Sequence, residues 1–153
     1  MIKKTALILI LVLFISSCGY KPIYLNKENN FSISSISIED KKRATYKIKN
    51  RLSKYVGLQN KKFSYKVFVG SKKVIRTTSK DEKGNPKSFR IQISVNLVVQ
   101  ENDIGIKQDF VETFTYQNKP NKFDLKKYEN EILDNLIEKI ILEIDEYLNN
   151  LKE

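Results

Sequence analysis

Apolar and polar residues alternate most regularly between Phe89 and Val99. Apolar side chains occupy every second position there, and polar residues stand between them. This period of two predicts a strand with one face in the core and the other in water. Weaker alternation predicts three further strands, at 31–38, at about 62–69 with a continuation to Arg76, and at about 104–116.

Two of these strands have an irregular phase. In the first, Ile36 and Ile38 share a face while Ile33 falls out of phase, which predicts a bulge or burial on both faces. In the last, apolar and polar residues fall on the same face: Phe110, Phe114 and Tyr116 with Gln108 and Glu112. The phase of the last strand therefore stays open.

Two segments show helical spacing instead. The first opens with Glu39 and Asp40, acids suited to a first turn, and Gly57 supplies its end. Its apolar stripe is Ala44, Ile48, Leu52, Tyr55 and Val56. The second helix has Asp124 as its expected N-cap. Its stripe is Leu125, Tyr128, Ile132, Leu136, Ile140, Ile144, Tyr147 and Leu151, widened by Leu133, Ile137, Ile141 and Leu148. This breadth favours a helix lying across a sheet over the alternative, a coiled-coil seam.

The order of elements, β-α-β-β-β-α, predicts the fold class. A loop at Ser79–Pro86, with Gly84-Asn85-Pro86 as its turn, and another turn at Asn102-Asp103 make the later strands antiparallel neighbours. The helix between the first two strands implies a right-handed parallel crossover. We expect an α+β two-layer sandwich, with a four-stranded mixed sheet and two helices on one face. The other face would be polar, and it either faces water or lies against a partner.

The N-terminus has the features of an export sequence. Lys3 and Lys4 precede an apolar run, Ala6–Ile15, followed by Ser16-Ser17-Cys18. Ten apolar residues rise roughly 15 Å in a helix, about half of a bilayer core, so a permanent membrane span is disfavoured.

The segment Ile15-Ser16-Ser17-Cys18-Gly19 resembles a bacterial lipobox, and Cys18 is the single cysteine of the chain. We therefore expect lipid on Cys18; the alternative is an ordinary signal peptide with a cysteine nearby. The expected organisation is a lipoprotein signal peptide at 1–17, a lipidated N-terminus and tether at 18–30, and one periplasmic domain at 31–153.

Composition limits the chemistry. The chain has no His, no Trp and one Cys, with a formal net charge of +10. This excludes Ser/His/Asp, Cys/His and zinc catalysis, and we expect no enzyme activity, cofactor or metal. A hydrolase using two carboxylates is the remaining enzymatic alternative, with Asp81, Glu82, Asp109 and Glu112 as its candidates. Export also removes nucleic acid from the expected partners.

The distribution of charge is more informative than its total, because the abundance of Lys, Asn and Ile is also what a biased genome composition produces. Residues 61–90 contain ten basic residues against Asp81 and Glu82, whereas residues 124–153 contain nine acidic residues against four lysines. The basic segment is either a solvated edge of a lysine-rich protein or an anion site. For an anion site, Arg76 and Arg90 are the candidates for bidentate phosphate contacts. Less specific attraction would come from Lys73, Lys80 and Lys87.

The segment Cys18-Gly19-Tyr20-Lys21-Pro22-Ile23-Tyr24 resembles the start of the mature chain in the family of LPS-assembly lipoproteins LptE. The order of elements as far as Leu151 is similar too, although the chain is short for that family. The resemblance implies an outer-membrane lipoprotein that lies in the lumen of the LptD β-barrel and assists insertion of lipopolysaccharide. Gly19, where inner-membrane lipoproteins often have Asp, also favours the outer membrane. The basic segment 61–90, which spans the hairpin of the second and third predicted strands, corresponds in kind to the family's lipopolysaccharide-contacting region. The alternative is a pilotin-like assembly factor for another outer-membrane pore.

Overall fold

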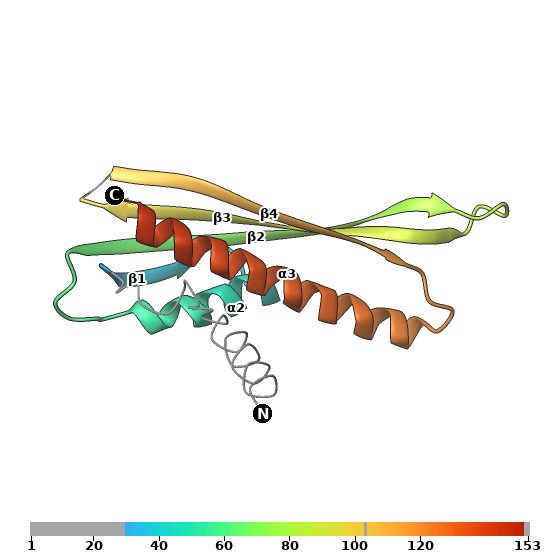
Figure 1. Ribbon diagram of the computed structural model, residues 1–153, viewed down its shortest axis with the longest axis horizontal. Helices are drawn as coiled ribbons and strands as arrows, with labels where there is room; N and C mark the ends of the chain where they lie inside the picture. Colours follow the sequence, from blue (N-terminus) through green and yellow to red (C-terminus); the bar gives the residue numbers. More distant parts are fainter. Residues whose placement is uncertain (1–29, 103, 152–153) are drawn as a thin grey trace, which may run out of the picture.

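The computed structural model describes residues 30–102 and 104–151. The expected signal peptide, Cys18 and the tether up to residue 29 lie outside these residues. The elements follow the expected order: β1 (Phe31–Ile38), α2 (Arg43–Leu52), the short 3-10 helix η2 (Ser53–Tyr55), β2 (Phe63–Lys80), β3 (Pro86–Glu101), β4 (Ile104–Gln117) and α3 (Lys122–Asn150). The strands form one sheet in the order β1-β2-β3-β4, with β1 parallel to β2 and the other neighbours antiparallel. Both helices pack on one face of it (Figure 1), which confirms the predicted α+β class.

The core lies between the helices and one face of the sheet. The alternation in β3 is confirmed, because its odd-numbered residues from Ile91 to Val99 are almost fully buried. The face opposite the helices is called the open face below. It carries Lys66, Lys72 and Arg76 of β2, Arg90, Gln92, Ser94 and Asn96 of β3, and Lys107 and Asp109 of β4.

The predicted bulge in β1 is present. The register with β2 shifts between Ile33 and Ser35, so that Ile33 lies beside Tyr65 and Ile36 beside Val67. Both isoleucines thereby face the helices, although they are three residues apart. The bulge explains the irregular phase of this strand.

The start and end of α2 differ in part from the prediction. The helix begins at Arg43, so Glu39 and Asp40 precede it and are not in its first turn. The stripe is buried as far as Tyr55, but Val56 is 44% exposed and lies outside the core. Gly57 has φ +72°, a left-handed conformation that glycine adopts without strain.

Helix α3 lies across the sheet and not in a coiled coil. Its N-cap is Asn121, whose side-chain oxygen accepts hydrogen bonds from the N–H groups of Phe123 and Asp124. The prediction of Asp124 as the N-cap was therefore wrong by three residues. The predicted stripe is buried or partly buried against the sheet. At one end of the helix Tyr128 packs edge-on to Tyr116 of β4.

The hairpin of β2 and β3 is longer than predicted. β2 runs to Lys80 and β3 begins at Pro86, so the expected loop at 79–86 is a turn of five residues. β1 pairs with β2 only as far as Val69. The outer half of the hairpin therefore extends past β1 and α2 (Figure 1).

The phase of β4 is settled by its register with β3. Phe110, Phe114 and Tyr116 lie beside Val95, Ile91 and Phe89 and so share the helix-covered face. Phe110 and Tyr116 are buried, but Phe114 is 43% exposed. β4 is an edge strand, so within the described part of the sheet its side chains have neighbours from β3 only, and none on the outer side.

Candidate functional site

A short turn at residues 81–85 closes the basic hairpin. The N–H of Asp81 donates to the carbonyl of Asn85 at 2.9 Å, and the N–H of Gly84 donates to the carbonyl of Asp81 at 3.0 Å. The Asp81 carboxylate accepts hydrogen bonds from the N–H groups of Lys83 and Asn85. The Asn85 side chain also donates a hydrogen bond to this carboxylate, and this bond has the largest effect in lowering the pKa of Asp81; the backbone hydrogen bonds add to it. Asp81 therefore organises the turn.

Arg76 and Arg90 are directly opposite each other on the open face. They are register partners in β2 and β3, and both are exposed. Arg90 Nε donates to Thr115 Oγ1 at 3.3 Å, and neither arginine has an ion-pair partner within residues 30–102 and 104–151. Like charges directly opposite each other in a sheet are destabilising, and a bound anion would relieve that repulsion. Guanidinium groups suit phosphate oxygens because they can donate two parallel hydrogen bonds.

The predicted lysines do not join the arginine pair. Lys73 lies beside Ile93, so its side chain belongs to the helix-covered side of the sheet. Lys80 pairs with Pro86 where the hairpin ends, and Lys87 follows immediately. The five candidates thus occupy three places: the open face, the opposite side and the tip.

Other lysines lie on the open face, but farther along the strands: Lys72 is four residues from Arg76, and Lys107 lies opposite Val98, eight residues from Arg90. Lys66 and Lys72 of β2 and Lys107 of β4 also belong to the open face. Two acids lie on the same face: Asp109, which accepts a hydrogen bond from Asn96 Nδ2 at 2.5 Å, and Glu39, whose side chain lies over Gly70. Lys107 was not among the predicted residues, because it lies outside the basic segment 61–90. The alternation of β4 would have placed it on the open face once the phase was known.

Three acidic residues of α3 form ion pairs with basic residues of α2 and η2 and not with the hairpin. Asp134 pairs with Arg43 at 3.0 Å and with Lys47 at 2.5 Å. Two further pairs continue the row: Arg51 with Glu138, and Lys54 with Asp145 at 2.8 Å. The net positive charge is therefore displayed mainly by the sheet.

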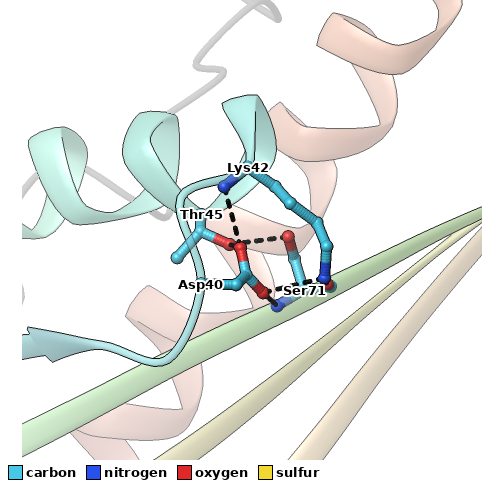
Figure 2. A network of polar contacts seen from close by, with 4 residues as sticks. All are labelled: Asp40, Lys42, Thr45 and Ser71. Carbon is cyan, nitrogen blue, oxygen red and sulfur yellow. Dashed lines mark hydrogen bonds and ion pairs between the residues drawn. The ribbon is translucent and has the colours of Figure 1, made fainter.

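A polar network marks the point where β1 ends (Figure 2). The Asp40 carboxylate accepts hydrogen bonds from Ser71 N–H, Lys42 N–H and Thr45 Oγ1, and Thr45 Oγ1 is 2.7 Å from Ser71 Oγ. Lys42 Nζ also reaches the Ser71 carbonyl. Although partial burial opposes the shift, these bonds hold the pKa of Asp40 well below its ordinary value. The network replaces β1 as the hydrogen-bonding neighbour of β2.

The four acids considered for a hydrolase do not converge. Asp81 and Glu82 lie at the tip of the hairpin, Asp109 lies on the open face, and Glu112 lies on the helix-covered face. Glu112 has other neighbours there: Lys139 Nζ at 3.8 Å, and Glu143. Burial, and then the charge of Glu112, raise the pKa of Glu143. This carboxylate pair left no signal in the sequence, because nothing local connects residues so far apart in the chain.

The described part of the chain has exposed surfaces on which a partner could bind, but its hollows are small for a ligand pocket. Its two best-formed hollows have volumes of ≈ 210 and ≈ 290 Å³, below or at the lower limit of typical ligand pockets, roughly 300–1,000 Å³. Among residues 30–102 and 104–151 there is no cluster of acids, cysteines and histidines able to hold a metal. The same residues contain no helix long and apolar enough to span a bilayer.

The fold is one found in small bacterial lipoproteins. Rare lipoprotein B from Shewanella oneidensis is 15% identical, with a TM-score of 0.53 over 76% of this chain and 90% of that chain. An uncharacterized lipoprotein B from Nitrosomonas europaea is 14% identical, with a TM-score of 0.59 over 87% and 92%. A minor lipoprotein from Acinetobacter baumannii is 14% identical, with a TM-score of 0.56 over 81% and 95%. No family model and no curated protein matches the sequence.

Proposed function

We propose that the chain is an outer-membrane lipoprotein, anchored through Cys18, that partners an LptD-type β-barrel and assists insertion of lipopolysaccharide. Three features support the proposal: the lipobox, the N-terminal resemblance to the LptE family and a fold shared with small lipoproteins. The observation that carries it is the arginine pair, Arg76 beside Arg90, on an open sheet face without ion-pair partners in the described residues.

The open face and the arginine pair would have different tasks. The polar residues of the open face, such as Gln92, Ser94 and Asn96, would make hydrogen bonds to the barrel wall. Arg76 and Arg90 would attract the phosphates of lipopolysaccharide, and the lysines farther along the open face would add to the positive field. The protein would act as a plug and scaffold and would carry out no covalent step.

The anion site can be tested by charge reversal. We expect Arg76→Glu with Arg90→Glu to weaken lipopolysaccharide binding at least tenfold at low salt, where exposed charge contacts are strongest. The matched control is Lys41→Glu with Lys127→Glu, which makes the same change in net charge at exposed sites away from the open face. Binding is measured with the full mature chain in detergent, and circular dichroism checks folding.

Equal losses in the two variants would show only a general charge effect and would contradict the site. The barrel partnership has a separate test, since a tagged full-length chain should co-purify with an LptD-type barrel from detergent-solubilised membranes. Recovery of a secretin alone would favour the pilotin-like alternative.

A further inference from the structure

Two exposed edge stretches of the sheet, β2 after Val69 and the outer side of β4, are protected to different degrees. β2 has no neighbour on one side after Val69, and this stretch carries Lys72, Lys73, Arg76 and Lys80. Charged residues, lysine above all, are a common device against unwanted strand pairing. β4, the other stretch, has 14 residues, one lysine, no proline and an uninterrupted register with β3. In the described part of the chain nothing pairs with its outer side.

The first half of β4 is also uncovered by helix α3. The helix packs on β4 from Phe110, beside Tyr147, to Tyr116. At the Tyr147 end, the next residue, Leu148, shares a hollow with Phe31 of β1 and Tyr65 of β2, so this end of the helix also reaches the side of the sheet opposite to β4. The helix therefore crosses the sheet obliquely (Figure 1). Ile104 and Ile106 remain 71% and 45% exposed on the helix-covered side of the sheet.

We propose that residues 104–112 of β4 pair antiparallel with the same segment of a second copy, about a two-fold axis through Gln108. Charge complementarity selects this register. The helix-covered faces of both copies coincide only if even-numbered residues lie opposite even-numbered ones. Among such registers, this one places Lys107 of each copy opposite Asp109 of the other. The registers on either side place Lys107 opposite Lys107 or Asp109 opposite Asp109, which is unfavourable.

The same register suits the packing of the two copies. Ile106 of each copy lies opposite Phe110 of the other, which already packs against Tyr147. Because α3 contacts β4 only from Phe110 onward, the two helices lie on opposite sides of the axis and do not collide. The exposed isoleucines are then covered.

A disulfide tests the axis directly. Opposed residues in an antiparallel pair have Cα atoms about 4.5–5.5 Å apart, within the range for a disulfide. Under mild oxidation, the full-length Gln108→Cys chain should form a disulfide-linked dimer. The control Gln117→Cys is an exposed residue of the same type on the same strand, but its two copies would lie about 60 Å apart. Neither this control nor the parent chain should form a disulfide-linked dimer.

A charge swap tests the register. In sedimentation equilibrium in detergent, Lys107→Asp should raise the dimer Kd about tenfold, because two like-charged pairs replace two ion pairs. The double variant Lys107→Asp with Asp109→Lys should restore the Kd, because each pair is only reversed. Circular dichroism confirms folding of each variant.

Several results would overturn the inference. They are a parent chain that stays monomeric over the concentration series, equal disulfide yields at positions 108 and 117, and a double variant no better than the single one. A crosslink from position 108 to a different envelope protein would assign the edge to that protein. None of these outcomes bears on lipopolysaccharide binding, so this inference and the proposed function can fail independently.

Discussion

Asp40 shows how one side chain can end a strand pairing. β1 stops at Ile38, while β2 continues, and the N–H of Ser71 would otherwise face no partner. The Asp40 carboxylate, 21% exposed, accepts that N–H at 2.9 Å and also binds Lys42 and Thr45 at the start of α2. One carboxylate therefore joins the sheet to the first helix.

We predict that Asp40→Asn lowers the free energy of unfolding by about 2 kcal/mol at neutral pH, because it removes charge-assisted hydrogen bonds. The pKa of Asp40 is lower in the folded than in the unfolded chain. The contribution is therefore complete above the ordinary pKa of 3.8 and declines progressively as pH falls from there toward the lower pKa of the folded chain, so a series ending at pH 3 shows the first part of that loss. Urea unfolding from pH 7 down to pH 3 measures it.

The difference between Asp40→Asn and the parent chain should shrink toward the acid end of that series. Glu131→Gln, an exposed position on α3, serves as the control and should change stability little at any pH. A difference that stays constant from pH 7 to pH 3 would contradict the assignment of the effect to the ionised carboxylate.

At the scale of elements, apolar packing and ion pairs hold the two helices in different ways. Ile48 of α2 and Ile137 of α3 are fully buried in the common core. The ion pairs of Asp134 with Arg43 and Lys47 lie at the surface, where about a third to a half of each side chain is exposed. Water and salt screen such pairs, so the packing dominates.

We predict that Asp134→Asn costs at most about 1 kcal/mol at low salt and nearly nothing at 1 M salt. Ile48→Ala should cost about 2–5 kcal/mol at both salt concentrations, because it leaves a cavity in the core. Denaturant unfolding of both variants at both salt concentrations makes the comparison. An Asp134→Asn loss that persists at high salt would show that the pair is more shielded than its exposure indicates.

At the scale of the whole molecule, stability decreases toward the tip of the hairpin. The inner half of β3, around Val95 and Leu97, is fully buried on the helix-covered face and flanked by β2 and β4. The outer half extends past β1 and α2, and residues 76–87 are exposed. The arginine pair lies in this outer half, so the candidate site is on the less stable part of the sheet.

We predict that amide hydrogens between residues 77 and 89 exchange through local opening, while those of Val95 and Leu97 exchange only through global unfolding. Hydrogen exchange by mass spectrometry or NMR resolves the two groups. Val95→Ala should speed exchange in the inner half and change the tip little. Equal protection along the whole hairpin would contradict this gradient.

Much of the fold follows from the sequence. The period-two pattern of β3 and the broad stripe of α3 identify these elements, because each depends on local geometry that a few residues establish. The boundaries were less certain: Asp124 and Asn121 both suit an N-cap, and only the hydrogen bonds decide in favour of Asn121. For the candidate site, the sequence identified Arg76 and Arg90. The alternation of side chains along two paired strands explains why both can lie on the same face of the sheet.

The tertiary structure decided what depends on distant segments. It placed Lys73 on the opposite face of the sheet from Arg76. It also paired Asp134 of α3 with Arg43 of α2, and it brought the Asp40 carboxylate to the N–H of Ser71. It also determined that α3 covers Phe110 but leaves Ile106 exposed on the same strand face. Local periodicity specifies the face on which a side chain lies. Which part of that face a helix covers, and which charges meet across it, depends on the angle at which remote elements pack.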